Sequence, residues 1–253
     1  MRNSSLVAAP RCSVATPAGA PRRLTGARRR RYDCAVSDGT AAVRGRFIVL
    51  EGGEGTGKSR LQRALIERLS AAGYRVDARR EPGGTPLGER IRDLINADAL
   101  GDDIAELLLF EAARAHLVER AIRPALAAGT HVICDRFTAS SVAYQSFGRL
   151  LDRDLVEQAN AIATRGLVAD LTLLLDAPPS VGLARRQQGG ALTHFDALPL
   201  AFHERVRSGY VELARESPAS WRVIDAARPF EAVLADAYAA VRAELGAPQP
   251  PAA

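Results

Sequence analysis

Lysine is nearly absent from this chain of 253 residues: 33 of its 34 basic side chains are arginines, and Lys58 is the only lysine. Cysteine is scarce as well, and Cys12, Cys34 and Cys134 form no metal-binding or paired-disulfide pattern. Because Cys134 falls in an expected buried strand, we expect a reducing, cytoplasmic setting. No apolar run is long enough to span a membrane, so no membrane partner is expected.

The net charge of +5 is distributed unevenly along the chain. Residues 1–45 contain nine arginines and two aspartates, a balance of +7, whereas the remaining residues contain 25 basic and 27 acidic side chains, a balance of −2. The basic character therefore belongs to the N-terminal segment, and the folded part gives little reason to expect a nucleic-acid partner.

Both ends of the chain have compositions that cannot form a core. Residues 1–44 are rich in Arg, Ala, Ser and Pro without apolar periodicity, so we expect a disordered basic extension. An organelle transit peptide shares this Arg-rich, acid-poor composition. A dispensable extension, which a mis-assigned start codon would also produce, is favoured because prolines interrupt any amphipathic helix. Residues 247–253 form a second expected disordered tail, which leaves residues 45–246 as the folded domain.

One glycine-rich stretch fits the phosphate-binding pattern G-x-x-x-x-G-K-[ST]. Its glycines let backbone N–H groups turn toward a polyphosphate, Lys58 reaches the outer phosphates, and the Ser59 hydroxyl can hold Mg²⁺. An apolar strand at 47–50 precedes it and a helix with apolar residues at helical spacing follows, so the anion would meet a helix N-terminus. This order of elements disfavours the alternative, a glycine-rich turn without a ligand. The expected ATP-binding residues are Gly52, Gly53, Glu54, Gly55, Thr56, Gly57, Lys58 and Ser59.

Strands alternate with helices along the folded part. Expected strands cover residues 47–50, 74–79, 130–135, 171–176 and 221–224. Expected helices include 103–128, with a break near Pro124, and segments at about 136–146 and 152–164. This alternation predicts an α/β fold in which a parallel sheet has helices on both faces and binds its ligands at the carboxyl ends of the strands.

The third expected strand ends at Asp135 and Arg136. A carboxylate at this place can hold the water shell of a Mg²⁺ that bridges two phosphates, and the arginine can clamp a second phosphate. Ser59 and Asp135 are therefore the expected metal-binding residues. The alternative is an aspartate that caps the next helix beside a solvated arginine.

Two sets of side chains share helix faces if both segments are helical: Phe110 with Arg114, and Arg136 with Ser140 and Tyr144. An aromatic ring one turn from a guanidinium group suits a planar base, whereas a position in the hydrophobic core is the alternative for Phe110.

Four motifs together closely resemble the bacterial thymidylate kinases, over residues 46–245. They are F-I-V-L-E-G-G-E-G-T-G-K-S (47–59), R-E-P-G-G-T (80–85), L-L-L-F-E-A-A-R (107–114) and D-R-F-T-A-S-S-V-A-Y-Q (135–145). The resemblance implies transfer of the γ-phosphoryl group of ATP to dTMP with Mg²⁺, which yields dTDP for DNA synthesis. It also implies a P-loop NTPase fold with five parallel strands in the order 2-3-1-4-5, and a homodimer formed through helices that include 103–128.

The resemblance also assigns roles at the base of the acceptor nucleotide. Phe110 would stack on thymine, and Arg114 would bond its O4 atom. Ser140 and Gln145 would face the edge of the base.

At the phosphate of the acceptor, the resemblance implies that Arg136 binds the 5′-phosphate. Arg80 is a second candidate for this contact. Tyr144 would crowd the 2′ position and favour deoxyribose. Glu54 would accept a hydrogen bond from the 3′-hydroxyl. The local sequence alone does not decide whether its side chain accepts from a hydroxyl or is a solvated position in the loop.

The segment after the fourth strand departs from the family pattern. Family members without an arginine in the phosphate loop, as here with Gly55, supply basic residues from a lid of alternating arginines followed by Asp-Arg-x-Glu. Here the lid has only Arg185 and Arg186, and T-H-F-D follows at 193–196. With Lys58 and Arg136 these two are the expected catalytic residues. Because a missing arginine finger costs about 10³–10⁵ in rate, a nucleotide-binding homologue with weakened catalysis is the alternative function.

Overall fold

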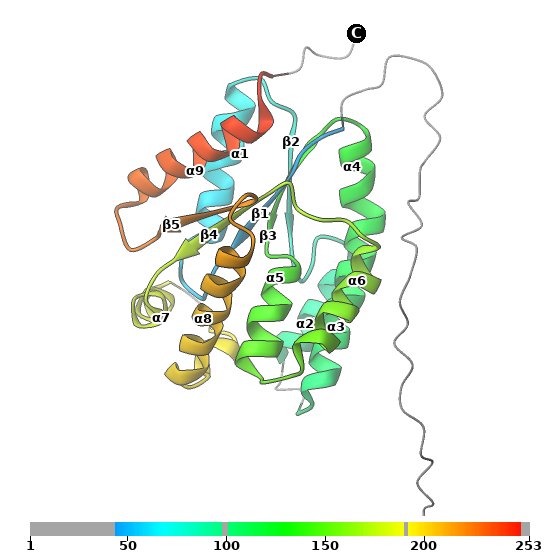
Figure 1. Cartoon of the computed structure of the whole chain (residues 1–253), viewed down its shortest axis with the longest axis vertical. Helices are drawn as coiled ribbons and strands as arrows, with labels where there is room; N and C mark the ends of the chain where they lie inside the picture. The colour runs from blue at the N-terminus through cyan, green and yellow to red at the C-terminus, as the bar shows by residue number, and fades with distance from the viewer. Residues whose placement is uncertain (1–43, 98–100, 190–191, 249–253) are drawn as a thin grey trace, which may run out of the picture. The chain divides into compact units, whose positions relative to one another are not determined.

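The computed structural model describes residues 44–97, 101–189 and 192–248 (Figure 1). Five parallel strands form one sheet in the order β2-β3-β1-β4-β5, which confirms the α/β class and the implied strand order. The strands are β1 Phe47–Glu51, β2 Val76–Arg80, β3 His131–Asp135, β4 Leu171–Asp176 and β5 Trp221–Asp225. Residues 1–43 of the expected disordered segment and 249–253 of the expected tail lie outside the described residues, whereas Arg44 is described and pairs with Asp170 at 3.1 Å.

The helices alternate with these strands along the chain. They are α1 Lys58–Ala71, α2 Pro86–Ala97, α3 Asp103–Leu117, the π-helix η1 Val118–Ile122, α4 Arg123–Ala127, α5 Thr138–Ser141, the π-helix η2 Val142–Gly148, α6 Arg153–Thr164, α7 Pro179–Gln188, the 3₁₀-helix η3 Phe195–Ala197, α8 Leu200–Glu216 and α9 Phe230–Leu245. None of these helices combines the length and the apolar character needed to cross a membrane.

Strand β1 is buried on both sides because helices cover both faces of the sheet (Figure 1). Alternate side chains of a strand point to opposite faces. Ile48 and Leu50 therefore pack with α1 and α9, whereas Phe47 and Val49 pack with α3, η1 and α4. Burial of one such side chain stabilises the fold by roughly 2 kcal/mol, which explains why this strand is an uninterrupted apolar run.

Pro124 does not break the helical stretch as expected. The chain instead widens into the π-helix η1 immediately before it, and the backbone N–H of Arg123 donates to the carbonyl of Val118. Proline has no N–H and its ring clashes with the carbonyl four residues earlier. One wider turn relieves this clash and lets the helix continue to Ala127.

The helix expected at about 136–146 is shifted toward the C-terminus. Arg136 precedes the helix, in a left-handed conformation with φ of +74°, and α5 begins only at Thr138. The segment continues as the π-helix η2 to Gly148. The side chains of Arg136 and Ser140 therefore meet because the chain bends before α5, and not because both residues lie on one face of a helix.

His131 gives a prediction about stability and pH. Its side chain is buried at the start of β3, and Nδ1 accepts a hydrogen bond from the backbone N–H of Arg46 at 2.9 Å. Burial and the nearby Arg46 lower the pKa of His131 below its usual 6.5. The unfolded chain therefore takes up the proton first as the pH falls, and stability present above pH 6.5 is lost below it.

We accordingly expect the wild-type melting temperature to fall more between pH 7.5 and pH 5.5 than that of His131→Gln, which keeps an acceptor but does not titrate. Thermal melts of both proteins, followed by circular dichroism, measure the two differences. Equal falls in the two proteins would show that His131 contributes nothing to the pH dependence.

Candidate functional site

The loop from Gly52 to Gly57 joins the end of β1 to the N-terminus of α1. Gly52, Gly55 and Gly57 have φ of +143°, +67° and +92°, a region that L side chains rarely adopt. At Gly55 a Cβ atom would lie 1.9 Å from the carbonyl oxygen of Gly182 in α7. The loop thus needs its glycines for backbone shape and for close approach to α7.

The Lys58 ammonium group lies against this loop. Nζ donates to the carbonyl oxygens of Gly52 at 2.9 Å and Gly53 at 2.8 Å, and the residue is only 7% exposed. Burial, together with the positive charge of Arg136, lowers the pKa of Lys58 to about 8. An incoming anion would offset both effects, so the site favours negative charge beside Lys58.

Ser59 and Asp135 are brought together at the start of α1 and the end of β3. The Ser59 hydroxyl donates to Oδ2 of Asp135 at 2.7 Å. Hydroxyl and carboxylate oxygens are the hard ligands that Mg²⁺ prefers, and Mg²⁺ at phosphates takes its other ligands from phosphate and water. The described residues contain no cluster of three or more His, Cys, Asp or Glu that would form a closed metal site. The pair therefore fits a Mg²⁺ ion held mainly by nucleotide and water.

Two adjoining cavities open at the carboxyl ends of the strands. The larger cavity, about 1080 Å³, extends from the glycine-rich loop to the segment 226–230 after β5. The smaller cavity, about 110 Å³, lies between α2, α3, η2 and the loop. Some residues line both: Glu54, Glu81, Arg92, Arg136 and Thr193. The two spaces meet at a junction that carries two guanidinium groups.

Arg136 is held at this junction by a set of polar groups. Nη2 donates to Oε1 of Glu54 at 2.6 Å and to the Tyr144 hydroxyl at 3.1 Å. Nη1 is within 3.3 Å of the Ser140 and Tyr210 hydroxyls. Burial alone would raise the pKa of Glu54. The positive charges of Arg136 and Lys58 outweigh this effect and hold that pKa below its usual range. A non-glycine residue in a left-handed conformation, supported by this many partners, is typical of a functional position.

One wall of the smaller cavity is aromatic. Phe110, Tyr144 and Phe195 line it. Tyr144 meets Phe195 edge to face with ring centroids 5.7 Å apart, and Phe110 lies 6.2 Å from Phe195. Such a wall suits a planar heterocycle, because aromatic faces stack on one another.

Ser140 and Gln145 also line the smaller cavity, and each is anchored by a buried glutamate. The Ser140 hydroxyl donates to Oε2 of Glu51 at 2.7 Å, and Nε2 of Gln145 donates to Oε1 of Glu106 at 2.9 Å. Burial raises the pKa of Glu51. Their expected position at the edge of a base is compatible with this arrangement and stays a prediction.

Arg114 lies behind the cavity wall, with 1% of its surface exposed. Its guanidinium donates to Glu81 at 2.8 Å, to Asn160 at 2.7 Å, to the Ser141 hydroxyl at 3.0 Å and to Glu111. Glu81 and Ser141 line the cavity, whereas Arg114 itself does not. Its expected contact with O4 of a base is untested, and in this structure most of its donors are already engaged.

Comparison with known proteins identifies the family. A sequence model for "Thymidylate kinase" matches residues 50–237. The thymidylate kinases of Thermomicrobium roseum and Deinococcus radiodurans are 50% and 45% identical over 201 and 198 residues, which cover 79% and 78% of this chain and 95% and 96% of those relatives. The crystal structure of thymidylate kinase from Ehrlichia chaffeensis has a TM-score of 0.66 at 30% identity, covering 79% of this chain and 99% of that one. The chain belongs to the thymidylate kinase family.

This membership confirms the resemblance carried by the four sequence motifs. Thymidylate kinases are ATP-dependent phosphotransferases that phosphorylate dTMP, and the chain has this function. Its relatives give no specific support to the alternative of weakened catalysis.

The two arginines of the expected lid, Arg185 and Arg186, lie at the end of α7, and both line the larger cavity. Nη1 of Arg185 donates to the carbonyl of Ala226 at 2.8 Å. Arg186 pairs with Asp196 at 3.0 Å, and Asp196 also accepts from the backbone N–H of Thr193 at 2.7 Å. Asp196 thus joins the end of α7 to the segment 193–196.

Sequence reasoning missed three of the residues that line both cavities: Glu81, Arg92 and Thr193. Arg92 in α2 lines both cavities and donates to the carbonyl of Pro82 at 3.0 Å; burial and the nearby Arg80 lower its pKa. Arg80, the second candidate for the phosphate in the sequence analysis, lines the larger cavity but not the smaller one and pairs with Glu89 at 2.7 Å. Nothing in the local pattern distinguishes Arg92 from its neighbour Arg90, because only the packing of α2 against α3 decides which one faces the cavity.

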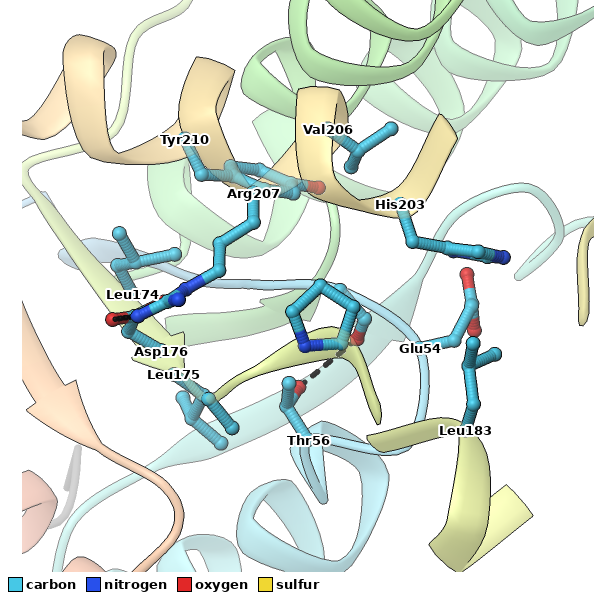
Figure 2. Close-up of a pocket in the computed structure, with 13 residues that line it drawn as sticks. Glu54, Thr56, Leu174, Leu175, Asp176, Leu183, His203, Val206, Arg207 and Tyr210 are labelled. Atoms are coloured by element: carbon cyan, nitrogen blue, oxygen red, sulfur yellow. Dashed lines mark hydrogen bonds and ion pairs between the residues drawn. The ribbon is translucent and has the colours of Figure 1, made fainter. Parts of the chain in front are cut away.

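A third cavity, about 20 Å³, lies behind the glycine-rich loop (Figure 2). It has room for about one water molecule and none for a nucleotide. Asp176 at the end of β4 binds Arg207 of α8 through two hydrogen bonds of 2.7 and 2.8 Å, and His203 of α8 lies beside Glu54 (Figure 2). The ion pair attaches α8 to the end of β4.

Proposed function

We propose that ATP occupies the larger cavity and dTMP the smaller one, so that their phosphates meet at the junction. The observation that carries this arrangement is the set of residues shared by both cavities, which includes Arg92 and Arg136. An oxygen of the dTMP 5′-phosphate attacks the γ-phosphorus of ATP. The bond from that phosphorus to the bridging oxygen breaks, and ADP leaves.

On the ATP side, the loop Gly52–Ser59 binds the phosphates with its backbone N–H groups and with Lys58. Ser59 and Asp135 would hold Mg²⁺, and the ion would supply positive charge that offsets the negative charge of the ATP phosphates. The lid residues Arg185 and Arg186 line the larger cavity. From there their positive charge stabilises the transition state of the phosphoryl transfer.

On the dTMP side, Arg136 binds the 5′-phosphate, assisted by Arg92 and, from the larger cavity, by Arg80. Glu54 accepts a hydrogen bond from the 3′-hydroxyl of the sugar. Tyr144, whose hydroxyl donates to Glu54 at 2.7 Å, occupies the space that a 2′-hydroxyl would need. This set of contacts favours a deoxyribonucleoside monophosphate. At the base, Arg114 stays a candidate for a hydrogen bond to O4 of thymine. Ser140 and Gln145 stay candidates for contacts with the edge of the base.

The coupled release of ADP tests this function directly, with dTMP, dUMP, dCMP and thymidine as acceptors. We expect the highest kcat/KM with dTMP and no turnover of thymidine, which lacks the phosphate that Arg136 binds. A higher kcat/KM with any other acceptor would overturn the assignment of the smaller cavity.

The aromatic wall gives a second test. Replacing Phe110 with leucine keeps apolar volume but removes the flat face, and base–aromatic stacking is worth about 1–3 kcal/mol. We expect kcat/KM for dTMP to fall about 10- to 100-fold, mainly through KM, whereas KM for ATP stays unchanged. Phe110→Tyr keeps a ring and is expected to stay near the wild type. If the leucine and tyrosine variants behave alike, Phe110 does not stack on the base.

We also propose that residues 45–246 form the catalytic domain and that the protein is a cytoplasmic homodimer. Leu94 in α2, Leu108 in α3 and Ile162 in α6 are exposed apolar side chains, and α3 packs against both other helices. Apolar side chains on adjacent helices support an interface between two copies of the chain. Sedimentation of the untagged protein measures its oligomeric state.

A further inference from the structure

Gln145 is oriented by a buried carboxylate from another helix. Nε2 donates to Oε1 of Glu106 in α3, across 39 residues of sequence, and the two residues are 1% and 3% exposed. Among the described residues, Oε1 of Gln145 receives no hydrogen bond. Because Gln145 also lines the smaller cavity, its amide has one end bonded to Glu106 and the other end available to a ligand.

Glu106 is itself held in place. Arg149 donates to its two oxygens, from Nη2 at 2.9 Å and from Nε at 3.4 Å. Asp103 lies 3.4 Å from Arg149, and His194 lies 3.7 Å from Glu106. The Arg149 guanidinium also lies over the ring of Phe202, 5.4 Å from its centre. These contacts leave little freedom for the Glu106 carboxylate to turn away from Gln145.

The chemistry of the two groups decides which end of the amide faces the cavity. A glutamine amide has a donor end and an acceptor end, whereas a carboxylate paired with arginine only accepts. The NH₂ group must therefore face Glu106, because the opposite orientation would bring two acceptors together in a buried place. It follows that the acceptor Oε1 faces the cavity.

We propose that Glu106 is a positioning residue for base specificity: by fixing the Gln145 amide, it presents an acceptor to the base and so selects pyrimidines that carry N3–H. Thymine and uracil have this donor. Cytosine has a lone pair at N3, which the Gln145 oxygen repels. The inference rests on the proposed function, because it takes the smaller cavity as the site of the base.

The test compares dTMP with dCMP on the variant Glu106→Gln, at saturating ATP. The new amide can either donate or accept, so Gln145 is free to turn its NH₂ group to the cavity. We expect the ratio of kcat/KM for dTMP to that for dCMP to fall about tenfold or more, chiefly through KM. Both substrates are measured on one preparation, so an inactive fraction cancels in the ratio. An unchanged ratio would overturn the inference.

A double variant provides a rescue that a purely structural role would not produce. In Glu106→Gln/Gln145→Glu the new amide donates to the new carboxylate, which again presents an acceptor to the cavity. We expect the selectivity ratio to return toward the wild-type value. This variant also keeps the inference testable if the single variant folds poorly, and a ratio as low as that of Glu106→Gln would count against it.

Two further variants separate this inference from the proposed function. Glu119→Gln removes a surface carboxylate that pairs with Arg165 at 2.9 Å and should leave the ratio unchanged. Gln145→Leu should lower the ratio if Gln145 reads the base. If it lowers the ratio and Glu106→Gln does not, only the role of Glu106 is wrong. If neither variant changes the ratio, Gln145 does not read the base, and its place in the proposed site is wrong as well.

Discussion

Replacing Lys58 with methionine lowers kcat by about 10³-fold and leaves the fold intact. The ammonium lies against the carbonyls of Gly52 and Gly53, where the ATP phosphates are expected. Methionine has a similar length and no charge, so the variant removes one cation from the transition state without opening a large cavity. Steady-state kinetics with dTMP and ATP, together with a thermal melt, measure both quantities.

Lys58→Arg is the matched control, because it keeps the charge but replaces a compact ammonium with a planar group. We expect it to recover only part of the lost activity. A fully active Lys58→Met variant would show that the loop binds phosphate through its backbone alone.

The single lysine also permits a chemical test of the same position. An amine-reactive reagent can modify only one side chain of this protein, besides the N-terminal amine. Because the pKa of Lys58 is about 8, part of the amine is neutral and nucleophilic near pH 8. We expect modification to abolish activity and ATP to protect against it, whereas Lys58→Arg should be insensitive. Equal inactivation with and without ATP would place the nucleotide elsewhere.

Replacing Arg136 with lysine lowers kcat/KM for dTMP by about 10²–10³-fold, while KM for ATP changes little. Lysine keeps the charge but cannot bond Glu54, Tyr144 and a phosphate at once from a planar fork. Glu54 would also lose a partner at 2.6 Å, so both the sugar contact and the phosphate contact weaken. Kinetics with each substrate varied in turn separate the two KM values.

Arg165 offers a matched control for this substitution. It also has a left-handed backbone, with φ of +49°, but its side chain is 65% exposed and pairs at the surface with Glu119. We expect Arg165→Lys to have wild-type kinetics. If Arg136→Lys raises KM for ATP as much as KM for dTMP, Arg136 serves the donor as much as the acceptor.

The backbone of the site was largely predictable from sequence, whereas the directions of its side chains were not. Gly52, Gly55 and Gly57 predicted the loop because their positive φ values are local requirements. Arg92 was missed because the local pattern does not tell which residues of α2 face the junction. Arg114 was expected at the cavity surface from its spacing to Phe110, yet the carboxylates of Glu81 and Glu111 hold it behind the wall.

The helices show the same division. Sequence spacing located the segment after β3 correctly but put Arg136 inside a helix, where its left-handed backbone does not belong. The break expected at Pro124 became a wider turn, because packing of α3 and α4 against the sheet outweighs the loss of one hydrogen bond.

What local chemistry dictates in this chain is the order of strands and helices and the place of the phosphate loop. Buried strands must be apolar runs, and a phosphate loop must combine glycines with the start of a helix. What only the packed chain decides is how residues distant in sequence meet: Glu54 with Arg136 across 82 positions, and Glu106 with Gln145 across 39. A hydrogen bond depends on the direction of both partners, and that direction is set by the packing of entire helices.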